Sequence, residues 1–292
     1  MNIIRMTGGL GNQLFGYALY LKFILSGTEC KIDDFSEYEG HDNRRPLMLE
    51  KIGIKYDRAT KAEVVAFTDS ERDIFHKILR KVRGKRSKEY SEATCNFDPE
   101  VLKKDSSYLT GYFQTEKYFK DISDKLRGDI NFSLLLNEIE KTDAHTYITQ
   151  NSDTPITSIH VRRGDYLNTP EIYGGICTDE YYAQAIEYIL SKEPESSFLI
   201  FSNDHEWAKG FAKESKDKYN RPFIPVTDTT EDDGCIDLYL MSRCRHNIIA
   251  NSSFSWWGAY LNQNKGKMVI APGKWANNRD YTDIYTDAMI RL

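Results

Sequence analysis

The second half of the sequence alternates apolar runs with helical patterns, and this alternation constrains the fold more than any other feature. After Pro155, runs typical of buried strands take turns with runs of helical spacing. The strand-like runs are Ile156–Val161, Phe198–Ser202, Asn247–Ala250 and Met268–Ala271, and the helical runs are Asp179–Ser191, Glu206–Glu214, Cys235–Arg243 and Phe254–Asn262. This order predicts an α/β fold with a parallel, doubly wound sheet, whose ligands bind at the carboxyl ends of the strands.

The first half begins with the same kind of unit. Asn2–Met6 predicts a short strand, which a glycine turn joins to an apolar helix over Leu14–Leu25. Gly27 is a suitable end for this helix. Further along, residues 134–150 predict another helix, and a polar linker follows it.

Length and charge set the broad class. The chain has 292 residues, of which 40% are apolar, so two cores can be buried. We expect one α/β domain over residues 1–150 and a second over residues 151–292, facing a cleft in which each holds one substrate. The net charge of −5 disfavours nucleic acid as the main partner, because phosphate binding needs a basic face.

The cysteines and the N-terminus indicate the compartment. Five cysteines, an odd number without CxxC spacing, disfavour a disulfide framework or a zinc site and favour a reducing cytoplasm. The first residues show no basic leader or cleavage site, and Lys22 interrupts an apolar run that is too short to span a bilayer. We therefore expect a cytoplasmic protein that is at most peripheral to a membrane.

A basic segment runs from Lys77 to Lys88 without one acidic residue. One interpretation is a solvated helix end and loop. The other is a weak contact with anionic lipid headgroups at the inner face of the plasma membrane.

The segment His160-Val-Arg-Arg-Gly-Asp-Tyr166 follows a predicted strand. The guanidiniums of Arg162 and Arg163 suit phosphate oxygens, and donors aimed at a departing pyrophosphate act mainly in the transition state. Asp165 can orient one of these arginines. The alternative is an Arg–Asp pair that ties the loop to the sheet.

A second cluster, Asn251-Ser-Ser-Phe-Ser-Trp-Trp257, lies between a strand and a helix. Hydroxyls and backbone N–H groups at a helix start favour an anion site, and Asn251 or Ser252 can equally be a helix cap. We expect Trp256 and Trp257 to face the core.

Two further motifs are weaker. In Phe201-Ser-Asn-Asp204 the carboxylate can accept hydrogen bonds from guanine or can cap the following helix. In Gly8-Gly-Leu-Gly-Asn-Gln13 the glycines allow close backbone approach, and the amides of Asn12 and Gln13 can bind hydroxyls. That turn departs from the dinucleotide pattern, so alone it is weak evidence.

Taken together, these motifs resemble the bacterial α-1,2-fucosyltransferases of glycosyltransferase family 11. The segments that carry the resemblance are, in chain order, GGLGNQLF, HVRRGDY, FSND and MSRC with NIIANSSFSWWGAYL. They cover both ends and the second half, and residues 35–150 are less recognisable. The resemblance implies a GT-B fold of two Rossmann-like α/β domains, with residues 1–150 on the acceptor side and residues 151–292 binding the nucleotide. It also implies GDP-fucose as donor, a galactose 2-hydroxyl of a glycan as acceptor, inversion at the anomeric carbon and no required metal or cofactor.

The resemblance also implies roles for residues. Arg162 is similar to an arginine on the β-phosphate, and Asn12 lies where relatives place a polar group near the reacting hydroxyl. The implied donor-binding residues are His160 (through its backbone), Arg163, Asp165, Ser202, Asn203, Asp204, Asn251, Ser252, Ser253 and Phe254. The implied acceptor-side residues are Gly9, Gly11 and Gln13.

Some alternatives stay open. Glu171, Asp33, Asp34 and His41 are conceivable bases for the acceptor proton. Relatives usually carry glutamine at the position of Gly16, and glycine there can widen the acceptor side. Rival functions are an α-1,3- or α-1,6-fucosyltransferase, another sugar-nucleotide transferase of the same fold, and a binding protein without turnover.

Overall fold

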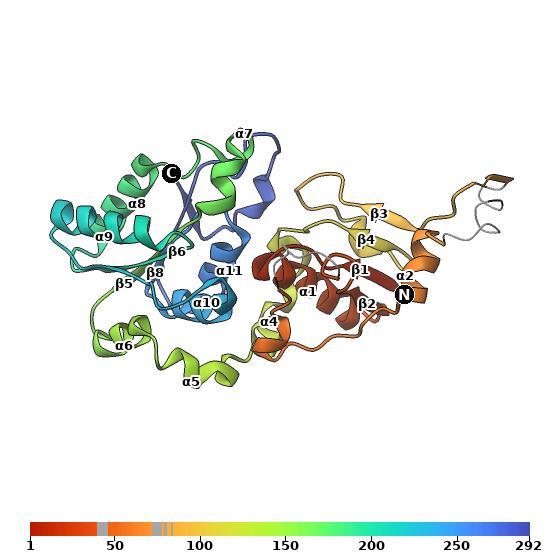
Figure 1. Ribbon diagram of the computed structural model, residues 1–292, viewed down its shortest axis with the longest axis horizontal. Coiled ribbons are helices and arrows are strands. Elements are labelled where there is room, and N and C mark those ends of the chain that lie inside the picture. The colour runs from red at the N-terminus through yellow and green to blue at the C-terminus, as the bar shows by residue number, and fades with distance from the viewer. Residues whose placement is uncertain (40–45, 72–77, 79–80, 83) are drawn as a thin grey trace. The chain divides into compact units, whose positions relative to one another are not determined.

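The contacts of the computed structural model divide the chain into two α/β units (Figure 1). The first unit contains Met1–Glu50 and Ile54–Asp129, and the second contains Lys51–Gly53 and Ile130–Leu292. The structure describes residues 1–39, 46–71, 78, 81–82 and 84–292, without the side chains of Asp165 and Leu167.

This division differs from the expected boundary at residue 150, because residues 130–150 pack against the second sheet. Ile139 and Ala144 share one core cluster with Ile156 and Leu199 of that sheet. The expected helix over 134–150 is also interrupted. Its parts are η5 (Phe132–Leu135), α5 (Leu136–Ile139) and α6 (Asp143–Gln150). Thr142 makes the break, because its hydroxyl donates to the Ile139 carbonyl and accepts from the His145 N–H, which caps α6.

The second unit has a parallel sheet in the order β10-β9-β8-β5-β6-β7. Its strands are β5 (Ile156–Val161), β6 (Ser197–Ser202), β7 (Phe223–Pro225), β8 (His246–Ile248), β9 (Val269–Ala271) and β10 (Met289–Arg291). Its other helices include α7 (Pro170–Tyr173), α8 (Asp179–Lys192), α9 (His205–Tyr219), α10 (Gly234–Arg243) and α11 (Ser253–Leu261). Numbered within the unit, the strand order is 3-2-1-4-5-6, that of dinucleotide-binding folds, so the ligand crevice is expected between β5 and β8.

Helices cover both faces of this sheet, as the alternation predicts. Side chains along β6 point alternately to opposite faces. Phe198 and Ile200 pack with α8 and α9, whereas Leu199 and Phe201 pack with α6 and α10. Each predicted strand and helix of the second half is present, with ends shifted by a few residues. The pattern missed β7 and β10, which are short, and β7 ends in a proline.

The first unit has a smaller parallel sheet in the order β2-β1-β4-β3. Its strands are β1 (Asn2–Arg5), β2 (Cys30–Asp33), β3 (Glu89–Ser91) and β4 (Tyr108–Thr110), and its α-helices include α1 (Leu10–Leu25), α2 (Lys61–Thr68) and α4 (Ser123–Asp129). The helix α1 ends as predicted: Gly27 has φ +78°, and its N–H donates to the Ile24 carbonyl. The strands β1 and β4 are neighbours in this sheet, although β4 is the last of its strands along the chain.

Met6 occupies the space beside Gly16, and the expectation that this glycine widens the acceptor side stays a prediction. Gly16 is buried in α1, and a Cβ there would meet the Met6 Sδ at 3.1 Å. The glycine thus lets the helix approach the end of β1, and Met6 fills the space.

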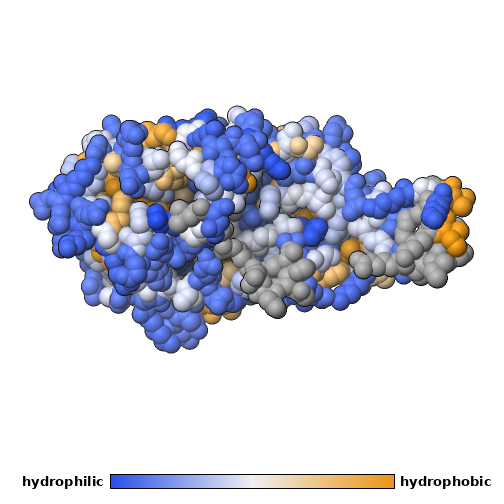
Figure 2. All heavy atoms as spheres, turned by 45° about the horizontal axis from the view of Figure 1, so that its top comes forward, coloured by the Kyte–Doolittle hydropathy of each residue, from blue (hydrophilic) through white to orange (hydrophobic). Residues whose placement is uncertain are grey.

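The molecular surface is mostly hydrophilic on the face that Figure 2 shows, with hydrophobic side chains in small groups. Among the described residues, no helix is both long enough and apolar enough to cross a membrane.

Candidate active site

Three of the sequence motifs meet at the carboxyl ends of the second sheet. The loop after β5 contacts the loop after β6, because the Arg163 N–H donates to the Asn203 Oδ1 at 3.1 Å. It also contacts the loop after β8, because the Tyr166 hydroxyl donates to the Asn251 carbonyl at 2.9 Å. These loops surround the crevice that the strand order predicts.

The turn after β5 depends on Gly164. Its φ of +42° favours glycine, and a Cβ there would collide with the amide of Asn203. Glycine thus lets the two loops approach each other. Asp165 follows in η6 (Gly164–Asn168), and its side chain lies outside the described part of the chain.

Arg163 and Asp204 form an internal pair. The Arg163 Nε donates to the Asp204 Oδ2 at 3.1 Å, and the guanidinium lies 5.0 Å from the Trp207 ring centroid. The Asp204 Oδ1 accepts from the Trp207 N–H and caps α9. This cap and Arg163 hold the pKa of Asp204 below its usual range. Both side chains therefore tie loops together, as one of the open interpretations predicted.

Arg162 lies beside two groups: its guanidinium is 5.9 Å from the Tyr166 ring centroid, and it also approaches Glu231. Its Nη1 lies 3.4 Å from the Glu231 Oε1, beyond the usual range of a charged hydrogen bond. Glu231 belongs to η7 (Glu231–Asp233), and its side chain is 55% exposed, whereas that of Arg162 is 13% exposed. A guanidinium beside an exposed carboxylate can exchange this partner for a phosphate at low cost.

His160 ends up as a neutral, buried imidazole. Burial, helped by the nearby charge of Arg162, lowers its pKa to about 3. Its ring lies 5.4 Å from that of Phe254, and its carbonyl accepts from the Tyr182 hydroxyl. A histidine with this pKa is not a general acid near neutral pH, in agreement with the expectation that its imidazole need not be a catalyst.

The helix α11 points its N-terminus at the same crevice. Ser252 is its N-cap, with an Oγ that accepts from the Phe254 N–H, and Ser253 begins the helix. A helix start with two hydroxyls favours an anion. Asn251 departs from its predicted role as a donor contact: it is 2% exposed, and its amide contacts Trp275 and Cys177. Its side chain positions the loop.

The two tryptophans of this motif are core residues, as predicted. Trp256 and Trp257 are both 0% exposed. The Trp256 Nε1 donates to the Ile284 carbonyl, and its ring stacks on Tyr260.

Asp237 is a candidate that the motifs did not include. It lies in the first turn of α10, directly after the η7 segment that reaches Arg162. The Thr229 hydroxyl donates to its Oδ1 at 2.8 Å. Burial raises the pKa of Asp237 to about 7, and the nearby Asp233 and Asp228 add to the effect. The sequence signal was weak: one acid between apolar residues in a helical run.

In the first unit, the turn after β1 brings two amides together. Gly8 has φ +71°, and Gly9 is the N-cap of α1. The Gln114 Nε2, from the loop after β4, donates to the Asn12 Oδ1 at 2.7 Å. This hydrogen bond joins the carboxyl ends of β1 and β4, which are neighbours in the sheet.

Gln13 is a structural residue, contrary to its expected place beside the acceptor. It is 0% exposed, and its Nε2 donates to the carbonyls of Gly8 and Pro46. Its Oε1 accepts from the Met48 N–H. Gly11 is likewise buried in the first turn of α1. These contacts fix the loop over α1 and leave no side-chain group for a ligand.

Two of the conceivable bases are engaged in the fold. Asp33 is 0% exposed and accepts from the Tyr108 hydroxyl at 2.6 Å. Asp34 accepts from Tyr56 and Arg58. Glu171 is exposed on α7, and His41 lies outside the described residues.

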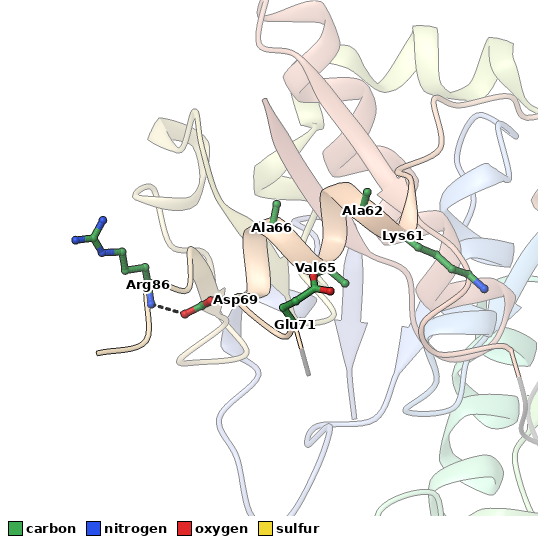
Figure 3. A pocket seen from close by; sticks show the side chains of 7 residues that line it. All are labelled: Lys61, Ala62, Val65, Ala66, Asp69, Glu71 and Arg86. Atoms are coloured by element: carbon green, nitrogen blue, oxygen red, sulfur yellow. Dashed lines mark hydrogen bonds between the residues drawn. The ribbon is translucent and has the colours of Figure 1, made fainter. Parts of the chain in front are cut away.

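An open pocket lies along α2 (Figure 3), and its lining residues are Lys61, Ala62, Val65, Ala66, Asp69, Glu71 and Arg86. Its lining shares Arg86 with the basic segment but no residue with the motifs of the candidate site, and we assign the pocket no function. Within the described part of the chain, no group of three His, Cys, Asp or Glu side chains is placed to hold a metal ion.

Comparison with known proteins identifies relatives. The model of glycosyl transferase family 11 matches residues 69–289. The O-antigen biosynthesis glycosyltransferase WbnK of Escherichia coli is 34% identical, over 98% of this chain and 99% of WbnK. The α-1,2-colitosyltransferase of Escherichia coli is 31% identical, over 94% of this chain and 91% of that protein. Human galactoside α-(1,2)-fucosyltransferase 1 is 27% identical over 52% of this chain and 42% of its own length.

A solved structure supports the fold. A mutant of Arabidopsis thaliana FUT1 in complex with GDP aligns with a TM-score of 0.51 at 11% identity, over 92% of this chain and 69% of that chain. The likeness confirms the predicted GT-B type, with two Rossmann-like α/β units.

Proposed function

The chain belongs to glycosyltransferase family 11, and from this premise we propose that it transfers L-fucose from GDP-fucose to the 2-hydroxyl of a galactose in a glycan, with inversion at the anomeric carbon. The observation that carries the proposal is the convergence of Arg162 and the α11 N-terminus at the switch point between β5 and β8. This crevice suits the diphosphate of a sugar nucleotide.

The proposed reaction is a single displacement. The acceptor oxygen forms a bond to the anomeric carbon while the bond from that carbon to the β-phosphate oxygen breaks, and GDP leaves with the electron pair. The acceptor O–H bond breaks late in this step, and its proton passes to water. Arg162 and the start of α11, with Ser252 and Ser253, stabilise the charge that develops on GDP. Arg163 does not need to touch the donor, because its contacts with Asn203 and Asp204 already position the loop that carries Arg162.

The guanine base needs a carboxylate that accepts from its N1–H and amino group. Each oxygen of Asp204 already accepts a hydrogen bond within the protein. Among the described residues, the Asp237 carboxylate accepts one, from Thr229. Asp237 is partly exposed, and an acid whose pKa is raised gains from new hydrogen-bond donors. We therefore place the guanine beside Asp237, with Asp204 as the positioning residue.

The linkage and the donor sugar are supported by different relatives. Both the colitosyltransferase and the human fucosyltransferase bear names that state an α-1,2 linkage. The colitosyltransferase favours a second candidate, transfer of colitose from its nucleotide-activated form. Both donors would make the same phosphate and guanine contacts, so the choice between the two candidate functions depends on the donor sugar.

The test is a transfer assay. Purified protein is given GDP-fucose or GDP-colitose with a panel of galactosides, GDP release is followed, and the product linkage is determined by NMR. We expect a fucosyl-α-1,2-galactoside. Colitosyl transfer with no fucosyl transfer would select the second candidate. A 1,3 or 1,6 linkage would reject the proposed acceptor position, and nucleotide-sugar binding without turnover would reject an enzyme.

We also propose that the basic segment contacts anionic lipid headgroups. Lys81 and Arg86 are exposed, and the neighbouring apolar side chains Ile78 and Val82 are 56% and 81% exposed. Lys77, Arg80 and Arg83 lie outside the described residues. Replacing Lys81 or Arg86 with serine should lower binding to anionic vesicles about fivefold, since each charge contributes about 1 kcal/mol near such a surface. Equal binding to anionic and neutral vesicles would reject the contact.

A further inference from the structure

The turn after β4 in the first unit has an unusual backbone. Phe113 has φ +50°, a left-handed conformation that aromatic residues rarely adopt, and it is 1% exposed. Such a conformation persists only where the surroundings enforce it, and it often marks a functional site.

Glu92 enforces the conformation. Its Oε2 accepts from the Tyr112 N–H at 2.8 Å, and its Oε1 accepts from the Phe113 N–H at 3.1 Å. Gly111 allows this approach, because a Cβ there would collide with the side chain of Glu92. The Phe113 ring packs edge-on against Tyr118, with ring centroids 6.0 Å apart. The turn is therefore held at both ends.

The result is that neighbouring side chains point in opposite directions. Phe113 and Gln114 are buried, whereas Tyr112 is 44% exposed. Within the described residues, Tyr112 is the one aromatic side chain that is exposed. An exposed aromatic ring on a rigid turn loses little conformational entropy when a ligand covers it.

This turn lies beside Asn12. Gln114, two residues beyond Tyr112, donates to the Asn12 Oδ1 at 2.7 Å. On the other side, the Tyr38 hydroxyl donates to the Gly8 carbonyl at 2.7 Å. Burial chiefly raises the pKa of Tyr38, and Tyr112 is near enough to add to this effect. The turn after β4 and the turn after β1 thus share one edge of the sheet.

We propose that the Tyr112 ring stacks on the C–H face of a pyranose in the acceptor glycan, next to the sugar whose hydroxyl meets Asn12. The inference rests on the proposed function and names the residue that selects the acceptor. Aromatic side chains suit this task because the ring covers apolar C–H groups while the hydroxyl stays in water. Glu92 acts as the positioning residue.

The test compares Tyr112→Ala, Tyr112→Phe and a control. The control is Leu25→Ala, since Leu25 is 50% exposed and lies at the opposite end of α1 from Asn12. For Tyr112→Ala we expect the KM for lactose to rise roughly five- to tenfold, with kcat and GDP affinity unchanged. Tyr112→Phe keeps the ring and should stay within about twofold of the wild type.

A second readout does not depend on transfer. Saturation-transfer NMR with lactose and with methyl β-galactoside reports which sugar protons touch the protein, and Tyr112→Ala should weaken the signal where Leu25→Ala does not. If the wild type binds lactose but transfers no fucose, the proposed function fails while this comparison still judges Tyr112. Unchanged lactose signals and KM in Tyr112→Ala, or no lactose signal in the wild type, would overturn the inference.

Discussion

The two sheets of this protein end in similar loops that carry different chemistry. At the switch point of the second unit, the loops after β5 and β8 present a guanidinium and a helix start with two hydroxyls. At the corresponding place in the first unit, the loops after β1 and β4 present the neutral amides of Asn12 and Gln114 and the ring of Tyr112. Both pairs of loops depend on a glycine with positive φ, Gly164 in one and Gly8 in the other.

Under the proposed function, loops with the same backbone arrangement would bind two different substrates. A diphosphate requires fixed positive charge, and a neutral glycan requires amides and an aromatic face. The local backbone permits close approach in both units, and the side chains decide what approaches. Substitutions in one unit should therefore change one substrate's parameters and leave the other's intact.

The largest effect is expected at Arg162. Arg162→Lys should lower kcat by roughly 10²–10³, since lysine keeps the charge but loses the planar fork that holds two phosphate oxygens. Arg163→Lys is the matched control. Because the contacts of Arg163 lie within the protein, this variant should lower the melting temperature while kcat stays near that of the wild type. Steady-state kinetics and thermal melts of both variants measure this. Near-normal turnover by Arg162→Lys would show that simple charge suffices.

A somewhat smaller effect is expected at Asn12. Asn12→Ala should reduce transfer by about 10²-fold, the cost of misplacing a reacting group by about 1 Å. GDP affinity, measured by calorimetry, should stay that of the wild type. Gln13→Ala serves as the control, because its buried amide supports the loop and its loss should lower stability. Lost GDP binding in a folded Asn12→Ala protein would break the division of labour between the two units.

The guanine site predicts a difference between two aspartates. Asp237→Asn should weaken GDP about tenfold, because an amide donor would face the donor groups of guanine. Asp204→Asn should mainly reduce stability through the lost cap of α9. Calorimetry and thermal melts of both variants separate the roles. If Asp204→Asn weakened GDP binding and Asp237→Asn mainly lowered stability, guanine would instead bind beside Asp204.

The same aspartate gives a pH signature. The raised pKa of Asp237, about 7, means that its contribution to stability is present below the ordinary value of 3.8 and is lost as the pH rises through about 7. Asp237→Asn removes this loss, so its gain in melting temperature over the wild type should grow from about pH 5 to about pH 8. GDP affinity of the wild type should rise over the same range. A constant difference in melting temperature would contradict the raised pKa of this carboxyl.

The smallest expected effect is that of a chelator. Arg162 and the α11 N-terminus supply the positive charge that a cation would otherwise bring, so we propose that turnover needs no metal. Transfer rates in excess EDTA should match those without it. Loss of activity that Mg²⁺ or Mn²⁺ restores would mean that Arg162 and the α11 N-terminus do not supply enough positive charge for turnover.

Most of the fold of the second half could be predicted from the sequence because strand-like runs there alternate with helical runs. The run over Ile156–Val161 gave β5 with its observed ends. In the first half, β3 is only Glu-Tyr-Ser with both ends exposed, so its place is set by pairing with β4 rather than by its own residues. No local pattern shows such pairing.

The site was predictable where a motif states both residue type and position. The arginines and the serines of α11 belong to such motifs. Asp237 belongs to no such motif, and its pKa is raised only by the packing around it. Phe113 and Tyr112 were also missed, because the left-handed backbone depends on Glu92, a residue about 20 positions away.

The contact between Gly16 and Met6 couples these two positions. Because a Cβ at position 16 would lie 3.1 Å from the Met6 Sδ, a larger residue at position 16 requires the methionine side chain to shift. The effect of a substitution at one of the two positions should therefore depend on the residue at the other.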